Sequence, residues 1–217
     1  MRAIVLPVKS LDEAKTRLAP VLEPLERAAL TLAMLEDVID ATSLLPGWET
    51  WVLSPDEAVL EVAARRGVTP ISEARPPLAA AIHQAEEEAV ERGASALAVL
   101  LPDTPLITGA ALTRAVHTLG PVVIAPARDE TGTNLLLRRP PTTIPSSFGL
   151  DSYRKHLQAA GQNDVPIAVV EQPELAFDLD APEDILRVLN SRRAGRSRQV
   201  LRELDLSDRL GATAQEG

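Results

Sequence analysis

The chain has 217 residues, which is enough for one domain with a sizeable core. Apolar residues make up 45% and charged residues 24%, the mix of an ordinary globular protein. There is no cysteine, which excludes a disulfide framework, a thiolate nucleophile and a cysteine-ligated metal site. The net charge of −9 argues against nucleic-acid binding, since a phosphate backbone needs a basic face, but a small anionic substrate can still meet a few local Lys and Arg residues. The first apolar stretch, 3–6, is too short for a signal peptide or membrane span, so we expect a cytoplasmic protein without membrane contact.

Strand-like and helix-like patterns alternate along the first two thirds of the chain. In order, the spacing of apolar residues predicts a strand over 3–8, a helix over 25–39, a strand over 49–54, a helix over 57–66, a strand over 68–71, a helix over 78–92, a strand over 97–101, a helix over 108–119, and strands over 122–125 and 134–138. Strands alternating with helices of about 10–15 residues indicate an α/β domain with a mostly parallel central sheet flanked by helices.

The pattern loosens after Pro140. We expect a helix over 152–160, a strand over 167–171 and a helix over 182–193, which complete a single domain over residues 1–193. The remaining segment, 194–217, has few apolar anchors, so we expect a loosely attached helix or partial disorder there. The sequence leaves the oligomeric state open, a homodimer included.

Three cations follow the first strand: Lys9, Lys15 and Arg17. In parallel α/β sheets ligands bind beyond the carboxyl ends of the strands, so this loop is a candidate for holding a nucleotide triphosphate. A flexible lysine such as Lys15 can also stabilise the charge on a leaving pyrophosphate, which makes Lys15 and Arg17 candidate catalytic residues. No glycine-rich cradle is present, so this is not a P-loop, and a solvated basic loop explains the same spacing equally well.

Carboxylates lie at two further places where a metal could bind. Asp103 directly follows the most apolar strand, where it can ligate a divalent cation or simply serve a turn or helix cap. Asp178 and Asp180 alternate on an expected short strand and so point to the same side. Two like charges this close repel unless a cation such as Mg²⁺ lies between them or one of them is protonated. Asp180 could instead cap the helix that begins at Pro182.

Two small polar segments are candidates for binding an anionic group. Exposed amides and hydroxyls in the turn Thr131–Asn134 can take a phosphate or carboxylate. The segment Ser147–Ser152 leads into a helix whose free N-terminal amides favour an anion. Each is also explained as an ordinary turn or cap. Histidines such as His156, His83 and His117 on predicted helices are more often packed or exposed than catalytic.

Taken in order, these segments resemble the phospholactate or phosphoenolpyruvate guanylyltransferase family of coenzyme F-420 biosynthesis, over about Arg2 to Leu189. The motifs that carry the resemblance are Pro7-Val8-Lys9 with Ala14-Lys15-Thr16-Arg17-Leu18, Pro102-Asp103-Thr104-Pro105, Thr131-Gly132-Thr133-Asn134-Leu135-Leu136, Phe148-Gly149 with Ser152-Tyr153 and His156, and Asp178-Leu179-Asp180-Ala181-Pro182-Glu183-Asp184. Each motif is modest alone, and their common order makes the resemblance specific.

The resemblance implies a single-domain, Rossmann-like nucleotidyltransferase of the nucleotide-diphospho-sugar transferase (GT-A) type. It implies transfer of GMP from GTP to 2-phospho-L-lactate, phosphoenolpyruvate or 3-phosphoglycerate, with release of pyrophosphate. It also implies Mg²⁺ on Asp103, Asp178 and Asp180, with Asp103 among the catalytic residues. The phosphate and carboxylate of the acid would lie near Thr133, Asn134, Gly149 and Ser152.

The sequence departs from the family pattern at Pro77-Leu78-Ala79, where members usually carry Gly-Leu-Asn, and at Asn134, which is often Thr. Three alternatives therefore stay open at this point. One is a paralogue with another nucleotide or acceptor, and another is a related enzyme acting on a molybdopterin or a sugar phosphate. The third is a non-catalytic nucleotide-binding protein on the same fold.

Overall fold

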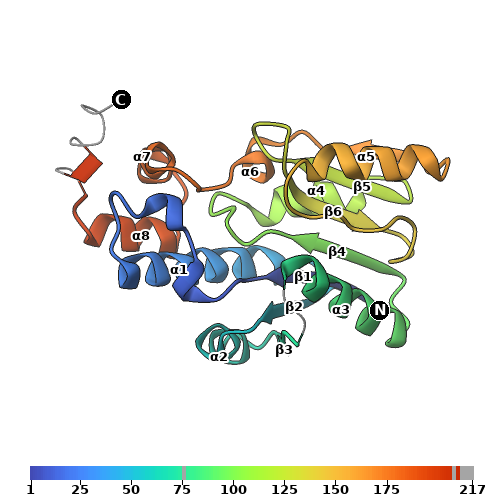
Figure 1. Ribbon diagram of the computed structural model, residues 1–217, viewed down its shortest axis with the longest axis horizontal. Coiled ribbons are helices and arrows are strands. Elements are labelled where there is room, and N and C mark those ends of the chain that lie inside the picture. The colour runs from blue at the N-terminus through green and yellow to red at the C-terminus, as the bar shows by residue number, and fades with distance from the viewer. Residues whose placement is uncertain (75–76, 207–208, 211–217) are drawn as a thin grey trace.

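The computed structural model describes residues 1–74, 77–206 and 209–210, and its centre is a seven-stranded sheet of order β3-β2-β1-β4-β6-β5-β7 (Figure 1). The strands are β1 (Arg2–Pro7), β2 (Glu49–Ser54), β3 (Thr69–Ser72), β4 (Ala96–Leu100), β5 (Val122–Pro126), β6 (Thr133–Arg138) and β7 (Ile167–Val169). Neighbouring strands pair in parallel except at β6, which is antiparallel to both β4 and β5. The expected α/β class and mostly parallel sheet are confirmed.

Helices cover both faces of the sheet. They are α1 (Pro24–Thr42), α2 (Glu57–Arg65), α3 (Leu78–Glu91), α4 (Gly109–His117), α5 (Ser152–Gln162), α6 (Pro173–Ala176), α7 (Pro182–Asn190) and α8 (Arg196–Glu203), with two 3₁₀ turns, η1 (Leu11–Glu13) and η2 (Thr16–Leu18). Alternate residues of β1 divide the core: Ile4 and Leu6 pack with α1, α2 and α4, whereas Ala3 and Val5 pack with α3. None of the described helices is both long and apolar enough to cross a membrane.

The antiparallel direction of β6 brings its first residues to the edge of the sheet where β4 ends. Leu100 pairs with Leu135, and the Leu101 amide donates to the Asn134 carbonyl at 2.9 Å. The turn that precedes β6 therefore lies beside the loops that follow β1 and β4. The sequence predicts the strand but not its direction, because a short strand with three consecutive leucines looks the same in a parallel and an antiparallel ladder.

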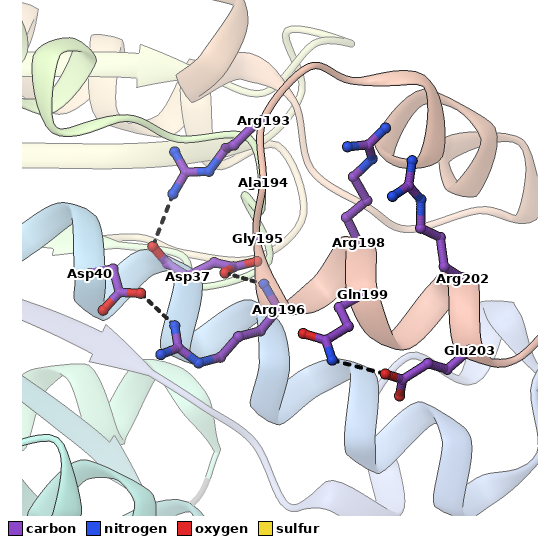
Figure 2. A pocket seen from close by; sticks show the side chains of 10 residues that line it. All are labelled: Asp37, Asp40, Arg193, Ala194, Gly195, Arg196, Arg198, Gln199, Arg202 and Glu203. Carbon is purple, nitrogen blue, oxygen red and sulfur yellow. Dashed lines mark hydrogen bonds and ion pairs between the residues drawn. The ribbon is translucent and has the colours of Figure 1, made fainter.

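The C-terminal segment, expected to be a loosely attached helix or partly disordered, contains a helix in its described part. Residues 196–203 form α8, which packs along α1 (Figure 1), with Leu201 and Leu206 in a core shared with Leu30 and Met34. The buried Asp37 of α1 accepts hydrogen bonds from the first two amides of α8, those of Arg196 (Figure 2) and Ser197. Periodicity on a single helix cannot reveal such a contact, because its partner lies about 160 positions earlier. Residues 207–208 and 211–217 of the expected tail lie outside the described residues.

Candidate active site

A cavity of about 620 Å³ opens at the carboxyl ends of β1 and β4, where ligands bind in parallel α/β sheets. Its walls come from the loop after β1, the turn after β4, the start of β6, the segment before α5 and the segment before α7. All the residues predicted for the site line it: Lys9, Lys15, Arg17, Asp103, Thr133, Asn134, Gly149, Ser152, Asp178 and Asp180. The fold thus gathers into one cleft residues that lie far apart in the sequence.

A second cavity of about 740 Å³ lies between α1 and α8 (Figure 2). It is larger, but its acidic side chains already have partners. Asp37 caps α8, and Asp40 pairs with Arg196 and Arg66. None of the predicted site residues lines this cavity, and it does not lie at the strand ends. We therefore take the strand-end cavity as the candidate active site.

Lys15 is at the centre of the site's electrostatics. Its side chain is only 9% exposed, and Nζ donates to Asp103 Oδ2 at 2.9 Å and to Asp180 Oδ1 at 2.7 Å. Its backbone adopts a left-handed conformation with φ +50°, which is uncommon for a residue with a side chain. Burial disfavours the ammonium, but the two carboxylates outweigh it and raise the pKa of Lys15 above its ordinary value. Lys15 therefore carries a full positive charge inside the cleft.

The other two cations of the loop are arranged differently. The side chain of Arg17 is 79% exposed, and its guanidinium lies 3.6 Å from Asp180 Oδ2. Lys9 is exposed at the cavity wall just beyond β1. The loop therefore offers two accessible cations, while the third, Lys15, is held by carboxylates instead of standing free to bind an anion.

Asp103 has one carboxylate oxygen without a partner. Oδ2 takes the Lys15 ammonium, whereas Oδ1 is buried and accepts no hydrogen bond within the described part of the chain. Leaving such an atom unpaired costs about 1–3 kcal/mol, so a buried oxygen of this kind points to a missing partner. The alternative of a helix cap does not hold, because Thr108 caps α4. The backbone of Asp103 is held beside the acidic segment, because its carbonyl accepts from the Leu179 amide at 3.0 Å.

Asp178 and Asp180 lie in an extended segment that pairs with no neighbouring strand among the described residues, so the expected strand here is wrong. The alternation nevertheless holds: Phe177 and Leu179 are buried in the core shared by α1 and α8, and the two carboxylates face the cavity. Burial, together with the charges of Asp103 and Asp180, raises the pKa of Asp178 to about 6. Three acids therefore lie close to the Lys15 ammonium, with the exposed Arg17 guanidinium 3.6 Å from Asp180.

These carboxylates suit a divalent cation that keeps part of its coordination for water and substrate. No group of three acidic or histidine side chains within residues 1–74, 77–206 and 209–210 has the geometry of a complete metal cage. Mg²⁺ typically binds through one or two carboxylates together with substrate phosphates and water, so a full cage is not required. The unpaired Asp103 oxygen and the raised pKa of Asp178 are consistent with that chemistry.

Asp184 supports the acidic segment, a role that the sequence motifs alone do not assign to it. Its carboxylate accepts from the amides of Asp180 and Ala181 at 3.0 and 2.9 Å, and from Arg128 at 2.9 Å. Burial opposes its ionisation, but these amides and the guanidinium outweigh it and lower the pKa of Asp184. Because Asp184 caps α7, the side chain of Asp180 is free for Lys15. Pro182 followed two residues later by Asp184 is the sequence signal that identifies this cap.

Thr133 and Asn134 both line the cavity, but they differ in which polar groups they have left for a ligand. Thr133 Oγ1 lies 3.1 Å from Nδ1 of the buried His156. The Asn134 side-chain amide donates to the carbonyls of Leu175 at 2.9 Å and Ala176 at 3.2 Å, so its two N–H groups are used to hold α6. Both residues line the cavity, but Asn134 has only its side-chain oxygen left for a ligand.

Gly149 and Ser152 line the cavity beside the turn that precedes β6, because the Tyr153 amide at the start of α5 donates to the Thr131 carbonyl at 3.2 Å. Ser152 begins α5, its amide donates to the Gly149 carbonyl at 3.1 Å, and it is buried at the cavity surface. Gly149 has φ +111°, a conformation that other residues rarely adopt. The predicted anion-binding turn is therefore a tight loop that precedes a helix N-terminus.

Comparison with known proteins agrees with this picture. The family model described as "Guanylyl transferase CofC like" matches residues 1–216. A phosphoenolpyruvate guanylyltransferase of Rubrobacter xylanophilus is 43% identical, covering 85% of this chain and 91% of its own length. A 3-phospho-D-glycerate guanylyltransferase of Phenylobacterium zucineum is 36% identical, covering 94% of this chain and 97% of its own.

The fold is also similar to those of solved structures. A structure from Desulfovibrio desulfuricans G20, described as a candidate nucleotide-diphospho-sugar transferase, superimposes with a TM-score of 0.77 at 20% identity and covers 98% of both chains. At that identity the similarity concerns the fold alone. The family model and the relatives go further: this chain belongs to the CofC-like guanylyl transferase family.

Proposed function

We propose that this protein transfers GMP from GTP to a small phosphorylated acid of the phosphoenolpyruvate, phospholactate or 3-phosphoglycerate type. The observation that carries the proposal is the cleft itself, where a buried ammonium, three carboxylates and a tight loop before a helix N-terminus line one cavity. One side suits a nucleotide triphosphate and the other a compact anion. The names of relatives with 43% and 36% identity support the same reaction class.

In this reaction an oxygen of the acid's phosphate attacks the α-phosphorus of GTP. The bond from that phosphorus to the β-phosphate breaks, and pyrophosphate leaves with the electron pair. The attacking oxygen is already anionic, so no general base is needed, which fits a cavity wall without histidine within the described residues. The protein's task is to position the two substrates and neutralise charge.

Each side of the cleft has a distinct part in that task. Lys9 and Arg17 are accessible to the triphosphate, and the ammonium of Lys15 lies deeper, where charge moves toward the leaving group. Gly149 and Ser152 would hold the acid through amides and a hydroxyl. A Mg²⁺ ion held by Asp103, Asp178 and Asp180 would neutralise phosphate charge.

The choice of nucleotide is the finer part of the proposal. Pro77 precedes α3 and Leu78 lines the cavity, so the segment that departs from the family pattern borders the binding site. An enzyme of the same reaction class with another nucleotide is therefore the second candidate. Both candidates assign the same roles to the carboxylates.

Assays that combine each nucleotide with each acid distinguish the two candidate functions. The purified protein is incubated with Mg²⁺, with each of GTP, ATP, CTP and UTP, and with each of the three acids. Pyrophosphate release and product mass are the readouts. We expect release only when both substrates are present, with GTP the preferred nucleotide. Preference for another nucleotide would favour the second candidate. If no combination releases pyrophosphate although a nucleotide binds tightly, the protein is non-catalytic.

A further inference from the structure

The loop that carries Gly149 and Ser152 does not hold its shape by local bonding alone. Within three residues it contains two positive φ values, +111° at Gly149 and +55° at Asp151. A left-handed conformation at a residue other than glycine is uncommon and persists when surrounding contacts impose it. A binding loop of this kind therefore needs an anchor beneath it.

His156 lies where such an anchor is needed. It is fully buried, and it lies one turn after Ser152 on the same buried face of α5. Its Nε2 accepts the amide hydrogen of Ser147 at 2.8 Å, and its Nδ1 lies 3.1 Å from the hydroxyl of Thr133. The ring also meets that of Phe148 edge-on, with centroids 5.2 Å apart. One side chain thus connects the loop, helix α5 and strand β6.

The hydrogen bonds assign the tautomer. The amide of Ser147 can only donate, so Nε2 must be the unprotonated nitrogen, and the ring proton lies on Nδ1. Nδ1–H then donates to Thr133, whose hydroxyl keeps its own proton available. Burial, with the charges of Arg138 and Lys155, lowers the pKa of His156 to about 4, so the neutral ring persists at physiological pH.

We propose that neutral His156 is the positioning residue of the acceptor side, fixing the Ser147–Ser152 loop against Thr133 of β6. It does not line the cavity, so it acts through the loop and not on the substrate. The inference rests on the proposed function only in naming a phosphorylated acid as the ligand of the loop. The order of the loop itself can be measured without any ligand.

Three substitutions separate the two contacts of the ring. His156→Phe keeps the packing against Phe148 and removes both hydrogen bonds. His156→Gln can still accept from Ser147, because its carboxamide reaches the position of Nε2, whereas the shorter His156→Asn reaches only the position of Nδ1. His117→Phe is the matched control, since His117 is exposed on α4 and Nδ1 contacts only the Thr113 carbonyl of its own helix.

Hydrogen–deuterium exchange of the free protein is the first readout. In His156→Phe we expect the hydrogen-bonded amides of this loop, those of Ser147 and Ser152, to exchange about tenfold faster or more, with the second half of α5 unchanged. His156→Gln should exchange like the wild type in this loop, and His156→Asn should resemble the Phe variant. If the Phe variant does not fold, the Gln and Asn pair decides. Exchange in the loop that is equal in all variants would overturn the proposal.

Calorimetric titration with each of the three candidate acids, and separately with GTP, is the second readout. His156→Phe should weaken binding of the acid by about tenfold and leave GTP within about twofold, because the loop lies on the acceptor side only. Equal weakening of both ligands would indicate a general loss of structure and contradict positioning. If the wild type binds none of the acids, the proposed function fails, whereas the exchange experiment still decides the role of His156.

Discussion

Asp103 is the residue whose surroundings fit a simple structural role least well, because one carboxylate oxygen is buried without a partner in the described part of the chain. We expect Asp103→Asn and Asp180→Asn to remove most Mg²⁺-dependent turnover, since each substitution removes a ligand charge. Turnover is measured against Mg²⁺ concentration, with circular dichroism as the check on folding. Asp164→Asn, an exposed position with φ +51° that asparagine tolerates, is the control. Activity within a few-fold of wild type in both cleft variants would end the metal assignment.

Lys15 supplies the positive charge that pairs with Asp103 and Asp180, so its removal tests the electrostatic part of the proposal. Lys15→Ala should lower kcat by about 10²–10³-fold, because a preorganised charge counts most where charge moves in the transition state. Arg17→Lys should have a smaller effect, since Arg17 is 79% exposed and its contact with Asp180 is long. Steady-state kinetics with varied nucleotide separates kcat from KM. A Lys15→Ala enzyme with normal kcat and normal nucleotide KM would show that the ion pairs serve only the fold.

His156 leads to a prediction of pH-dependent stability. Its folded pKa of about 4 lies below the ordinary value of 6.5, so the unfolded chain binds a proton first as the pH falls. The free energy of unfolding should therefore fall between pH 8 and pH 5, by about 2 kcal/mol from this residue alone. Arg138 and Lys155 are the charged neighbours that contribute to the shift.

Urea unfolding of wild type and His156→Phe at both pH values isolates this contribution from that of other titrating groups, such as Asp178. The Phe variant should be less stable at pH 8 but should lose about 2 kcal/mol less on acidification. Parallel losses in the two proteins would contradict a buried neutral imidazole.

The start of helix α8 is held to helix α1 by one side chain, that of Asp37. Asp37 accepts from the Arg196 amide at 2.7 Å (Figure 2). It also accepts from the Ser197 amide at 3.0 Å and from Ser197 Oγ at 2.5 Å. Gly195 is also required, because a Cβ there would lie 2.7 Å from the Asp37 carboxylate. The helix is therefore joined to α1 at its first turn.

Asp37→Ala should lower the free energy of unfolding by about 3 kcal/mol, since it removes the cap of α8 and leaves the buried Ser197 hydroxyl unpaired. Urea unfolding measures the loss, with Asp40→Ala, a half-exposed neighbour on α1, as the comparison. Asp37 does not line the active-site cavity, so kcat at a temperature well below the melting transition should stay within about twofold. A stability loss no larger than that of Asp40→Ala would show that α8 is held by its apolar face alone.

The elements also show what a sequence can and cannot predict here. Apolar runs ending in polar residues locate β1 and β4, and the strand-end rule then selects Lys15 and Asp103 from the order of residues alone. The rule says nothing about which side chains contact one another. That Lys15 lies between two carboxylates, that Asn134 binds α6, and that His156 anchors a loop all depend on tertiary contacts.

At the scale of the whole molecule, the net charge of −9 coexists with a cleft that must accept two anions. A cleft in an acidic protein can accept anions if it has local positive charge, and Lys9 and Arg17 are accessible at the wall of this one. The carboxylates of the cleft are available for a cation. The cleft is built from loops that meet because β6 runs antiparallel beside β4. The Lys15 cluster itself joins both halves of the chain, since Asp180 lies 165 positions after Lys15.

The most direct test of the account follows the phosphorus atoms. The protein is incubated with Mg²⁺, phosphoenolpyruvate and GTP labelled with ³²P at either the α or the γ position, and the products are separated. The account predicts that the α label appears in a GMP–acid conjugate and the γ label in pyrophosphate, and that Asp103→Asn forms neither product. Release of γ label as inorganic phosphate, or α label that remains in free GMP, would contradict guanylyl transfer in this cleft.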